Sequence, residues 1–276
     1  MTDRYAVIGN PVAHSQSPFI HAEFARQTGQ DLVYERILAP LDRFSATVQD
    51  FRAEGGHGLN VTLPFKLEAF RLANELGVRA QEAEAVNTLK FEGATVYGDN
   101  TDGTGLVRDI QDNLGFRIEG RDVLVMGAGG AAQGVASVLL EAKPGRLVIA
   151  NRTVEKAERL AGRLRTARSI SPATLSASSY PELAGRQFDL IINATAASLN
   201  DTAPDVPEGT FGPDSLAYDM MYGKGMTPFL ELALSQGAAR LADGIGMLVE
   251  QAAESFLIWR GVRPQTRPVI EALKAR

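Results

Sequence analysis

The stretch Val123-Leu124-Val125-Met126-Gly127-Ala128-Gly129-Gly130-Ala131-Ala132 decides the fold class of this chain. An apolar run leads directly into G-x-G-x-x-A, which is typical of the first strand–helix turn of a dinucleotide-binding βαβ unit. The first glycine permits a tight turn, the second lets the backbone approach a pyrophosphate, and the last small residue lets helix and strand pack closely. The helix that follows offers free N–H groups to an anion. The same letters also fit an ordinary strand–turn–helix, but the βαβ setting favours a cofactor site at Gly127, Ala128, Gly129, Gly130 and Ala131.

The end of the next strand indicates which cofactor that turn would take. An NAD-binding unit usually carries Asp or Glu there to bind the ribose 2′-hydroxyl. This chain has Asn151, Arg152 and Thr153 instead, with Lys156 one helical turn later. An arginine can stack on adenine and pair with a phosphate, which a carboxylate would repel. The sequence therefore predicts NADP, and the alternative is a solvated basic helix start.

Strand-like and helical patterns alternate along the whole chain, which is the pattern of parallel α/β folds. In the second half we expect strands at residues 122–126, 146–150, 189–193, 216–220 and 239–242, helices at 130–142, 153–164, 227–236 and 246–259, and a loop at 198–214. In the first half we expect strands at residues 5–9, 32–37, 58–62, 85–91 and 95–98, and helices at 18–29, around 41–51 and at 66–76. The two series predict two domains, with a boundary on a helix that starts near Asp102.

Bulk composition narrows the class of protein. The chain has 276 residues, 45% apolar and 22% charged, as expected of a soluble globular protein. Its net charge of -5 argues against a nucleic-acid partner. The absence of cysteine excludes disulfides and thiolate catalysis and fits a reducing cytosol. We expect a cytoplasmic protein without a signal peptide or membrane span, and no metal site, because the three histidines lack paired ligand spacing.

Two polar loops suggest a proton-transfer site. Lys66 ends the run Asn60-Val61-Thr62-Leu63-Pro64-Phe65-Lys66, and Asp102 lies in Gly98-Asp99-Asn100-Thr101-Asp102-Gly103. Each loop follows a strand-like run, and α/β folds bind ligands at the carboxyl ends of their strands. Alone, Lys66 would be a solvated surface group and Asp102 a helix cap. Together, and with a hydride carrier downstream, they predict an alcohol dehydrogenase in which Lys66, or the coupled pair, moves the proton.

Other polar residues could complete that site. Ser15 and Ser17 place two hydroxyls beside a predicted helix N-terminus, which suits a carboxylate, although Ser17 could also be only a cap. Gln251 is a polar group in an apolar helix, four residues after Met247. Gln251 is therefore either exposed or reaches a ligand.

Taken together, the motifs resemble the shikimate dehydrogenase family over nearly the whole chain. In order, they are residues 9–18 (GNPVAHSQSP), 60–66 (NVTLPFK), 85–88 (AVNT), 98–103 (GDNTDG), 127–131 (GAGGA), 151–153 (NRT), 218–222 (YDMMY) and 243–251 (DGIGMLVEQ). The resemblance implies an N-terminal α/β substrate domain with a mainly parallel sheet, residues 1–101, completed by C-terminal helices within 245–276. It also implies a Rossmann-type NADP-binding domain at residues 102–244.

The resemblance further implies NADPH-dependent, reversible reduction of 3-dehydroshikimate to shikimate in aromatic amino-acid biosynthesis, by a monomer or homodimer. It assigns the substrate carboxylate to Ser15 and Ser17. The ring hydroxyls are assigned to Thr62, Lys66, Asn87, Asp102, Tyr222 and Gln251, and the nicotinamide to Met220 and Gly244. One departure is Asn193-Ala194-Thr195-Ala196-Ala197-Ser198, where the family more often has serine and then glycine after Asn-Ala-Thr.

Three alternatives compete with this prediction. A quinate/shikimate dehydrogenase that uses NAD is the nearest, and Arg152 with both serines argues against it. A non-catalytic sensor of a shikimate-like ligand would have no use for both Lys66 and Asp102. A glutamyl-tRNA reductase shares the glycine-rich turn and the Asn-Arg-Thr strand end, but it needs a nucleophilic cysteine, which this chain lacks.

Overall fold

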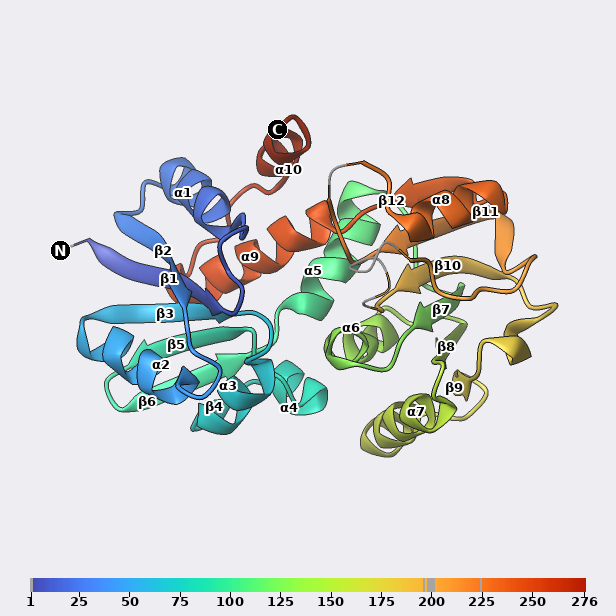
Figure 1. Cartoon of the computed structure of the whole chain (residues 1–276), viewed down its shortest axis with the longest axis horizontal. Coiled ribbons are helices and arrows are strands. Elements are labelled where there is room, and N and C mark those ends of the chain that lie inside the picture. The colour runs from blue at the N-terminus through green and yellow to red at the C-terminus, as the bar shows by residue number, and fades with distance from the viewer. Residues whose placement is uncertain (1, 196, 198–201, 224) are drawn as a thin grey trace. The chain divides into compact units, whose positions relative to one another are not determined.

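Two separate sheets organise the protein. In the computed structural model, which describes residues 2–195, 197, 202–223 and 225–276, the chain divides into two compact units (Figure 1). Unit 1 comprises Met1–Gly105 and Leu248–Arg276, and unit 2 comprises Leu106–Met247. Each unit contains a six-stranded sheet of its own.

The sheet of unit 1 is mixed. Its order is β2 (Leu32–Leu38), β1 (Asp3–Gly9), β3 (Gly56–Val61), β5 (Thr88–Glu92), β6 (Thr95–Asp99) and β4 (Glu75–Leu76). The pairs of β1 with β2 and β3 are parallel, those of β5 with β3 and β6 are antiparallel, and β4 is parallel to β6. The parallel half brings the carboxyl ends of β1 and β3 to one edge, where Ser15, Thr62 and Lys66 follow.

Apolar side chains cover both faces of that sheet. One core cluster joins Ile8, Leu59 and Leu89 to residues of α2 (Phe44–Ala53), α3 (Lys66–Leu72) and α4 (Val78–Ala83). Aromatic contacts link β1 and α1 (Ser17–Thr28) to α9 (Ile245–Arg260), including a stacked pair of Tyr5 and Trp259 with centroids 4.7 Å apart. α10 (Arg267–Lys274) follows α9 and ends the chain. The C-terminal helix α9 thereby belongs to the core of the N-terminal unit.

The sheet of unit 2 is wholly parallel. Its order is β12 (Arg240–Ala242), β11 (Phe211–Asp219), β10 (Phe188–Asn193), β7 (Asp122–Met126), β8 (Arg146–Ala150) and β9 (Leu175–Ser178). Among its helices, α6 (Gly130–Glu141) and α7 (Val154–Arg168) follow β7 and β8, and α8 (Pro228–Ser235) precedes β12. This is the doubly wound order, and its strand order reverses between β7 and β10.

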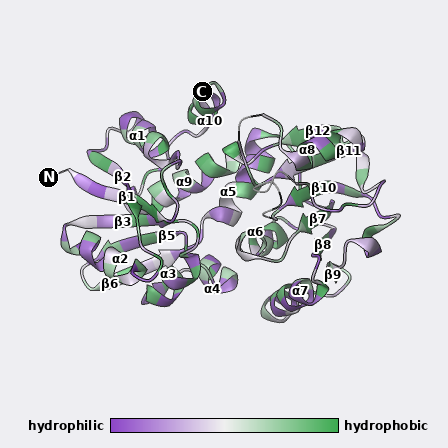
Figure 2. Ribbon diagram, in the orientation of Figure 1, coloured by the Kyte–Doolittle hydropathy of each residue, from purple (hydrophilic) through white to green (hydrophobic). Residues whose placement is uncertain are grey.

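The central strands of unit 2 are buried on both faces. Val123, Leu124, Val125 and Met126 of β7 are each 0% exposed. Figure 2 shows hydrophobic residues along β7 and β10 and alternating character on α7. Unbroken apolar strands and one-sided helices are what a parallel α/β sandwich requires. The α/β fold with a Rossmann-type half is therefore confirmed.

One predicted helix is too long. We expected a helix over residues 66–76, but α3 ends at Leu72 and the chain enters β4. Asn74 is the cause, because its backbone N–H donates to the Val96 carbonyl at 3.0 Å and its Oδ1 accepts the Val96 N–H at 2.8 Å. Those bonds tie the segment to the edge of β6 and compete with helix continuation.

The predicted loop over residues 198–214 is also partly wrong. β11 begins at Phe211, inside that range, and its register against β10 shifts between Phe188 and Leu190. Pro213 and Asp214 lie in the irregular part, which hides the strand from periodicity. Short elements were missed as well, namely β9, α4 and α10, since four to eight residues give little periodic signal.

The helices of the described residues were compared with the length and hydropathy of a transmembrane helix. None of the helices within the described residues combines the length and the apolar character that a transmembrane span needs.

Candidate functional site

Lys66 and Asp102 form an ion pair. Lys66 is the first residue of α3, just after β3, and Asp102 is the first residue of α5 (Asp102–Arg108), just after β6. Lys66 Nζ lies 2.5 Å from Asp102 Oδ2, and the side chains are 27% and 10% exposed. A charged pair at this depth stays accessible to a small molecule while most of the carboxylate is withdrawn from water.

Asn87 holds the other oxygen of the carboxylate. Asn87 Nδ2 donates to Asp102 Oδ1 at 2.8 Å and to Thr101 Oγ1 at 2.9 Å. Asn87 Oδ1 accepts the Thr101 backbone N–H at 2.9 Å, so the orientation of the amide is determined by its partners. Asn100 Oδ1 accepts the Asp102 N–H at 3.1 Å. Both carboxylate oxygens of Asp102 are therefore directed by fixed neighbours.

Gln251 approaches the same cluster from α9. Its Oε1 lies 3.4 Å from both Asn87 Nδ2 and Thr101 Oγ1, and its Nε2 donates to the Leu248 carbonyl at 2.8 Å. Gln251 is half-buried, and its side chain faces Asn87 and Thr101. Lys66, Asn87, Asp102 and Gln251 thus come together within unit 1.

A buried polar chain, which the sequence analysis missed, supports this cluster from behind. Thr88 Oγ1 contacts Ser255 Oγ at 2.7 Å, and Asn60 Nδ2 donates to Ser255 Oγ at 2.9 Å. Asn60 Oδ1 in turn accepts from Tyr34 at 2.7 Å and lies 3.2 Å from His21 Nε2. One signal was available, because Ser255 follows Gln251 by four residues and shares its helix face.

His21 and Tyr34 end that chain in an apolar setting. Their rings stack with centroids 4.2 Å apart, and His21 is 0% exposed. Burial lowers the pKa of His21 to about 3, against a smaller opposing effect of Asn60. Burial also raises the pKa of the Tyr34 hydroxyl. Both side chains are therefore neutral near pH 7.

The serine pair lies on the turn into α1. Ser15 Oγ donates to Ser17 Oγ at 3.1 Å, so the two hydroxyls meet. Ser17 is already inside the first turn of the helix, since the N-cap is Gln16, which makes no side-chain cap bond. The alternative that Ser17 caps the helix is therefore wrong, because Gln16 occupies the N-cap position and the Ser17 N–H itself donates to Ser15 Oγ at 3.3 Å. Thr62 is half-buried after β3 and makes no side-chain hydrogen bond to Lys66.

In unit 2 the glycine-rich turn has the geometry that an anion site needs. Gly127 has φ 105°, and a Cβ there would lie 2.9 Å from the Ala194 carbonyl oxygen. Only glycine fits such a turn without strain. A Cβ at Gly129 or Gly130 would meet no protein atom within 4 Å, and the N-cap of α6 makes no side-chain cap bond. Residues 129–131 are exposed, so the start of α6 has room for an anion.

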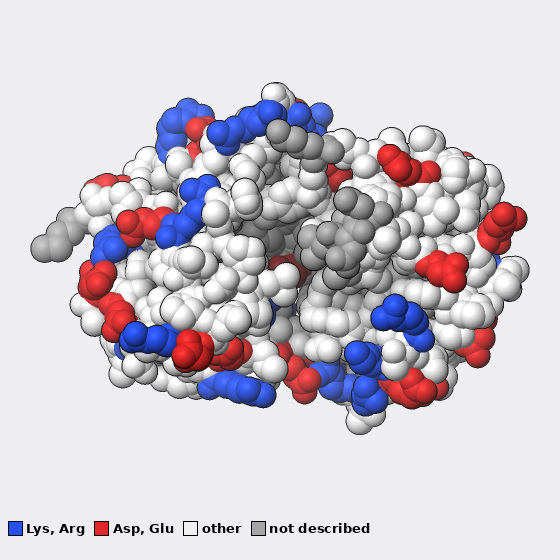
Figure 3. All heavy atoms as spheres, in the orientation of Figure 1, with Lys and Arg blue, Asp and Glu red and all other residues white. Residues whose placement is uncertain are grey.

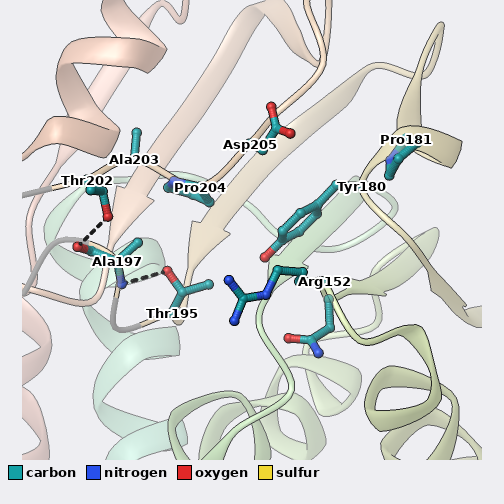
Figure 4. A pocket seen from close by; sticks show the side chains of 10 residues that line it. Arg152, Tyr180, Pro181, Thr195, Ala197, Thr202, Ala203, Pro204 and Asp205 are labelled. Atoms are coloured by element: carbon teal, nitrogen blue, oxygen red, sulfur yellow. Dashed lines mark hydrogen bonds between the residues drawn. The ribbon is translucent and has the colours of Figure 1, made fainter. Parts of the chain in front are cut away.

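A cavity of about 660 Å³ opens beyond the end of β8 (Figure 4). Among the predicted cofactor residues, Asn151 and Arg152 line it, whereas Thr153 and Lys156 are exposed at the start of α7 and do not. The remaining lining residues are Tyr180, Pro181, Thr195, Ala197, Thr202, Ala203, Pro204 and Asp205. Sequence reasoning missed Tyr180 because it follows β9, which was not predicted.

Thr195 and Ala197, from the segment whose sequence departs from the family pattern, line this cavity. Asn193 Oδ1 accepts from Thr195 N at 3.1 Å and from Thr195 Oγ1 at 2.7 Å, and Ala197 N donates to Thr195 Oγ1 at 3.2 Å. Asn193 thus holds Thr195, Thr195 in turn holds Ala197, and Figure 4 shows the bond between Ala197 and Thr195. Ala196 and Ser198 lie outside the described residues.

Met220 and Gly244 also come together in unit 2. A Cβ at Gly244 would lie 2.3 Å from the Met220 carbonyl oxygen, so only glycine allows this approach. Buried Asp219 accepts from Asn193 Nδ2 at 3.1 Å, Met221 N at 3.0 Å and Thr227 Oγ1 at 2.6 Å. Asp219 therefore ties the Met220 segment to the Asn193 loop. Tyr222 is 37% exposed and lies in unit 2.

A doubly wound unit with an open glycine-rich turn, and a second unit with a partly buried ammonium–carboxylate pair, define the class of nucleotide-dependent dehydrogenases. Comparison with known proteins narrows that class. The substrate-binding-domain model of shikimate dehydrogenase matches residues 7–89, the shikimate/quinate 5-dehydrogenase model matches residues 109–202, and the shikimate 5′-dehydrogenase C-terminal-domain model matches residues 244–274. The chain belongs to the shikimate dehydrogenase family.

Relatives and solved structures agree with this assignment. The chain is 59% identical over 274 residues to a shikimate dehydrogenase (NADP(+)) of Chromobacterium violaceum, covering 99% of this chain and 98% of the relative. It is 61% identical over 275 residues to the enzyme of that name from Nitrosospira multiformis, covering 100% and 98%. The shikimate 5-dehydrogenase of Thermus thermophilus, solved in complex with NADP(H) and shikimate, has a TM-score of 0.87 at 32% identity, and 99% of each chain is covered.

Proposed function

We propose that this protein catalyses the reversible, NADPH-dependent reduction of 3-dehydroshikimate to shikimate, a step of aromatic amino-acid biosynthesis. The observation that carries the proposal is the 2.5 Å contact between Lys66 Nζ and Asp102 Oδ2 in a chain of this family. An ammonium held in this way can give a proton to an oxygen that becomes an alkoxide. Bound NADPH supplies the hydride.

The proton step follows from the geometry of the pair. As the ketone carbon gains a hydride, its oxygen gains negative charge, and Lys66 donates a proton to that oxygen. Asp102 keeps the Lys66 ammonium oriented, and Asn87 keeps Asp102 oriented through its 2.8 Å bond. In the oxidative direction neutral Lys66 takes the hydroxyl proton back. Since the two groups are in direct contact, the proton belongs to the pair.

The remaining residues of unit 1 would hold the substrate. The hydroxyls of Ser15 and Ser17, 3.1 Å apart, can both donate to a carboxylate. Thr62, Asn87 and Gln251 offer hydroxyl and amide groups to the ring hydroxyls. Tyr222, which the family resemblance assigns to a ring hydroxyl, lies in unit 2 and is 37% exposed.

Unit 2 would hold the cofactor. The turn of Gly127, Ala128, Gly129, Gly130 and Ala131 suits the pyrophosphate, since a Cβ at Gly129 or Gly130 would meet no protein atom within 4 Å and the start of α6 has room for an anion. Arg152 and Asn151 in the cavity suit the adenosine end with its 2′-phosphate, and Thr153 and Lys156 are exposed at the start of α7. Met220 and Gly244, which pack against each other, suit the nicotinamide.

A spectrophotometric assay at about 340 nm, crossing two substrates with two cofactors, tests the proposal. We expect turnover of shikimate with NADP⁺ to exceed turnover with NAD⁺ or with quinate. Equal or better catalytic efficiency with NAD⁺ would reject the NADP preference, and preferred oxidation of quinate would favour the quinate/shikimate enzyme. Ligand binding without any NADPH oxidation in the presence of 3-dehydroshikimate would favour a sensor.

The proposal includes a cytoplasmic location and small-molecule partners only. On the face in Figure 3, Lys and Arg side chains lie close to Asp and Glu side chains at several places. A monomer or a homodimer fits the proposal equally, and sedimentation analysis of the purified protein distinguishes them.

A further inference from the structure

Tyr180 lines the cavity of unit 2, and its aromatic ring is packed in the core. Its side chain is 9% exposed and belongs to a core cluster with Met126, Ala150 and Leu183. The hydroxyl end lines the cavity, and Figure 4 shows it pointing towards the Arg152 guanidinium. A buried tyrosine ring presents its polar end at low entropic cost, because few rotamers remain to be restricted.

The backbone around Tyr180 is held as well. Glu182 Oε2 accepts from both Ser179 N and Ser179 Oγ at 2.8 Å. The Leu183 N–H donates to the Tyr180 carbonyl at 3.0 Å, which closes the turn η2 (Pro181–Leu183). These bonds set the direction in which the ring enters the core.

The hydroxyl of Tyr180 has its hydrogen available. No residue that the structure describes accepts a bond from it, whereas the neighbouring hydroxyl of Thr195 already donates to Asn193 Oδ1 at 2.7 Å. Burial raises the pKa of the Tyr180 phenol to about 12, with a smaller opposing effect of Arg152. The group therefore remains a donor throughout the physiological pH range.

A 2′-phosphate needs more than Arg152 can give. Near pH 7 a phosphate monoester carries roughly -1.5 to -2 charges and three acceptor oxygens. Among the residues that line the cavity, Arg152 is the one cation and Asp205 is an acid. A neutral donor beside the guanidinium adds a bond without adding another charge to be desolvated.

We propose that Tyr180 donates its hydroxyl hydrogen to the 2′-phosphate of NADP(H), beside Arg152, and so helps the enzyme to discriminate against NAD(H). The inference rests on the proposed function, because it assumes that this cavity takes the adenosine end of the cofactor. The role is one of specificity and leaves the proton relay of unit 1 unchanged.

Calorimetric titration with 2′,5′-ADP and 5′-AMP tests it, because these probes differ only in the 2′-phosphate. Wild-type protein, Tyr180→Phe and Arg152→Ala are compared, with thermal unfolding used to establish that each variant is folded. The Phe variant keeps the ring and its packing. We expect Tyr180→Phe to weaken binding of 2′,5′-ADP about tenfold, the scale of one hydrogen bond to a charged group, and to leave 5′-AMP unchanged.

The outcomes separate the two proposals. If wild-type protein binds both probes equally, the NADP preference fails and the role of Tyr180 fails with it. If wild-type protein prefers 2′,5′-ADP and Arg152→Ala loses that preference while Tyr180→Phe keeps it, only the role of Tyr180 is overturned. Equal weakening of both probes by Tyr180→Phe would also overturn it, since the lost contact would then not be to the 2′-phosphate.

Discussion

The two candidate half-sites are built in opposite ways. In unit 1 the Lys66–Asp102 pair is already joined, and Asn87, Thr101 and Gln251 bond to it or to each other. In unit 2 the turn at Gly129 and Gly130 faces open space, and Arg152 is exposed on a cavity wall. Proton transfer depends on groups placed within hydrogen-bond reach, and the half-site in unit 1 therefore needs a rigid support. A large anionic cofactor needs unobstructed backbone N–H groups and room.

Removal of the Lys66 ammonium should have the largest effect on activity. A small effect would contradict the comparison between the two half-sites. In Lys66→Ala we expect kcat to fall by about 10²–10⁴-fold with a modest change in KM, since the variant loses the proton donor but keeps the other contacts. Steady-state kinetics with shikimate and NADP⁺ measure it. Lys90→Ala is the matched control, because Lys90 is also half-buried and ion-paired, with Glu92 at 2.6 Å. A large rise in KM with intact kcat would reassign Lys66 to binding.

Removal of the cation in the cavity should affect only the open half. In Arg152→Ala we expect kcat/KM for NADPH to fall about 10- to 100-fold while kcat/KM for NADH stays nearly constant, because only NADPH carries the 2′-phosphate. Arg159→Ala, an exposed arginine on α7 outside the cavity lining, is the control. Equal losses with both cofactors would show that Arg152 stabilises the fold or the adenine, and not the phosphate.

The free energy of unfolding should also depend on pH through buried His21 of unit 1. Because burial holds the pKa of His21 at about 3, the unfolded chain binds a proton near pH 6.5 that the folded chain does not. This contribution to stability is complete above pH 6.5 and declines as the pH falls towards 3. Between pH 6 and 5 we expect the free energy of unfolding to drop by about 1 kcal/mol through His21.

Urea unfolding at several pH values measures that slope. In His21→Phe the slope should flatten, whatever the change in absolute stability, while in the control His14→Gln, an exposed histidine, it should remain. A slope that survives in His21→Phe would mean that the buried polar chain behind the Lys66 pair is not a dry, neutral support.

The smallest expected effect concerns the acid in the cavity. In Asp205→Asn we expect two- to fivefold tighter binding of 2′,5′-ADP, because an exposed carboxylate that repels a phosphate costs little in water. Calorimetry at low and high salt measures it, and the gain should shrink as salt rises. A weaker affinity for 2′,5′-ADP would instead make Asp205 an acceptor for the ribose or the adenine.

Sequence patterns predicted the framework of both units well. The strand before Gly127 and the helix after it appear at nearly the predicted bounds, since apolar runs and glycine punctuation are local signals. The sequence patterns gave wrong predictions where a residue distant in the chain determines the local structure. Asn74 ends α3 through its bonds to Val96, which is 22 residues away in the chain. Tyr180 became part of the cavity through a strand of only four residues.

The amino-acid sequence by itself determined the residue types and their order: a glycine-rich turn, a basic strand end without an acid, and a lysine and an aspartate that each follow a strand. These are short-range properties, and the motif spacing was enough to indicate the family. Only the tertiary structure decided which groups meet. Asn87 orients Asp102, Gln251 turns inward, and Tyr180 faces Arg152, because such meetings depend on the packing of segments up to 164 residues apart.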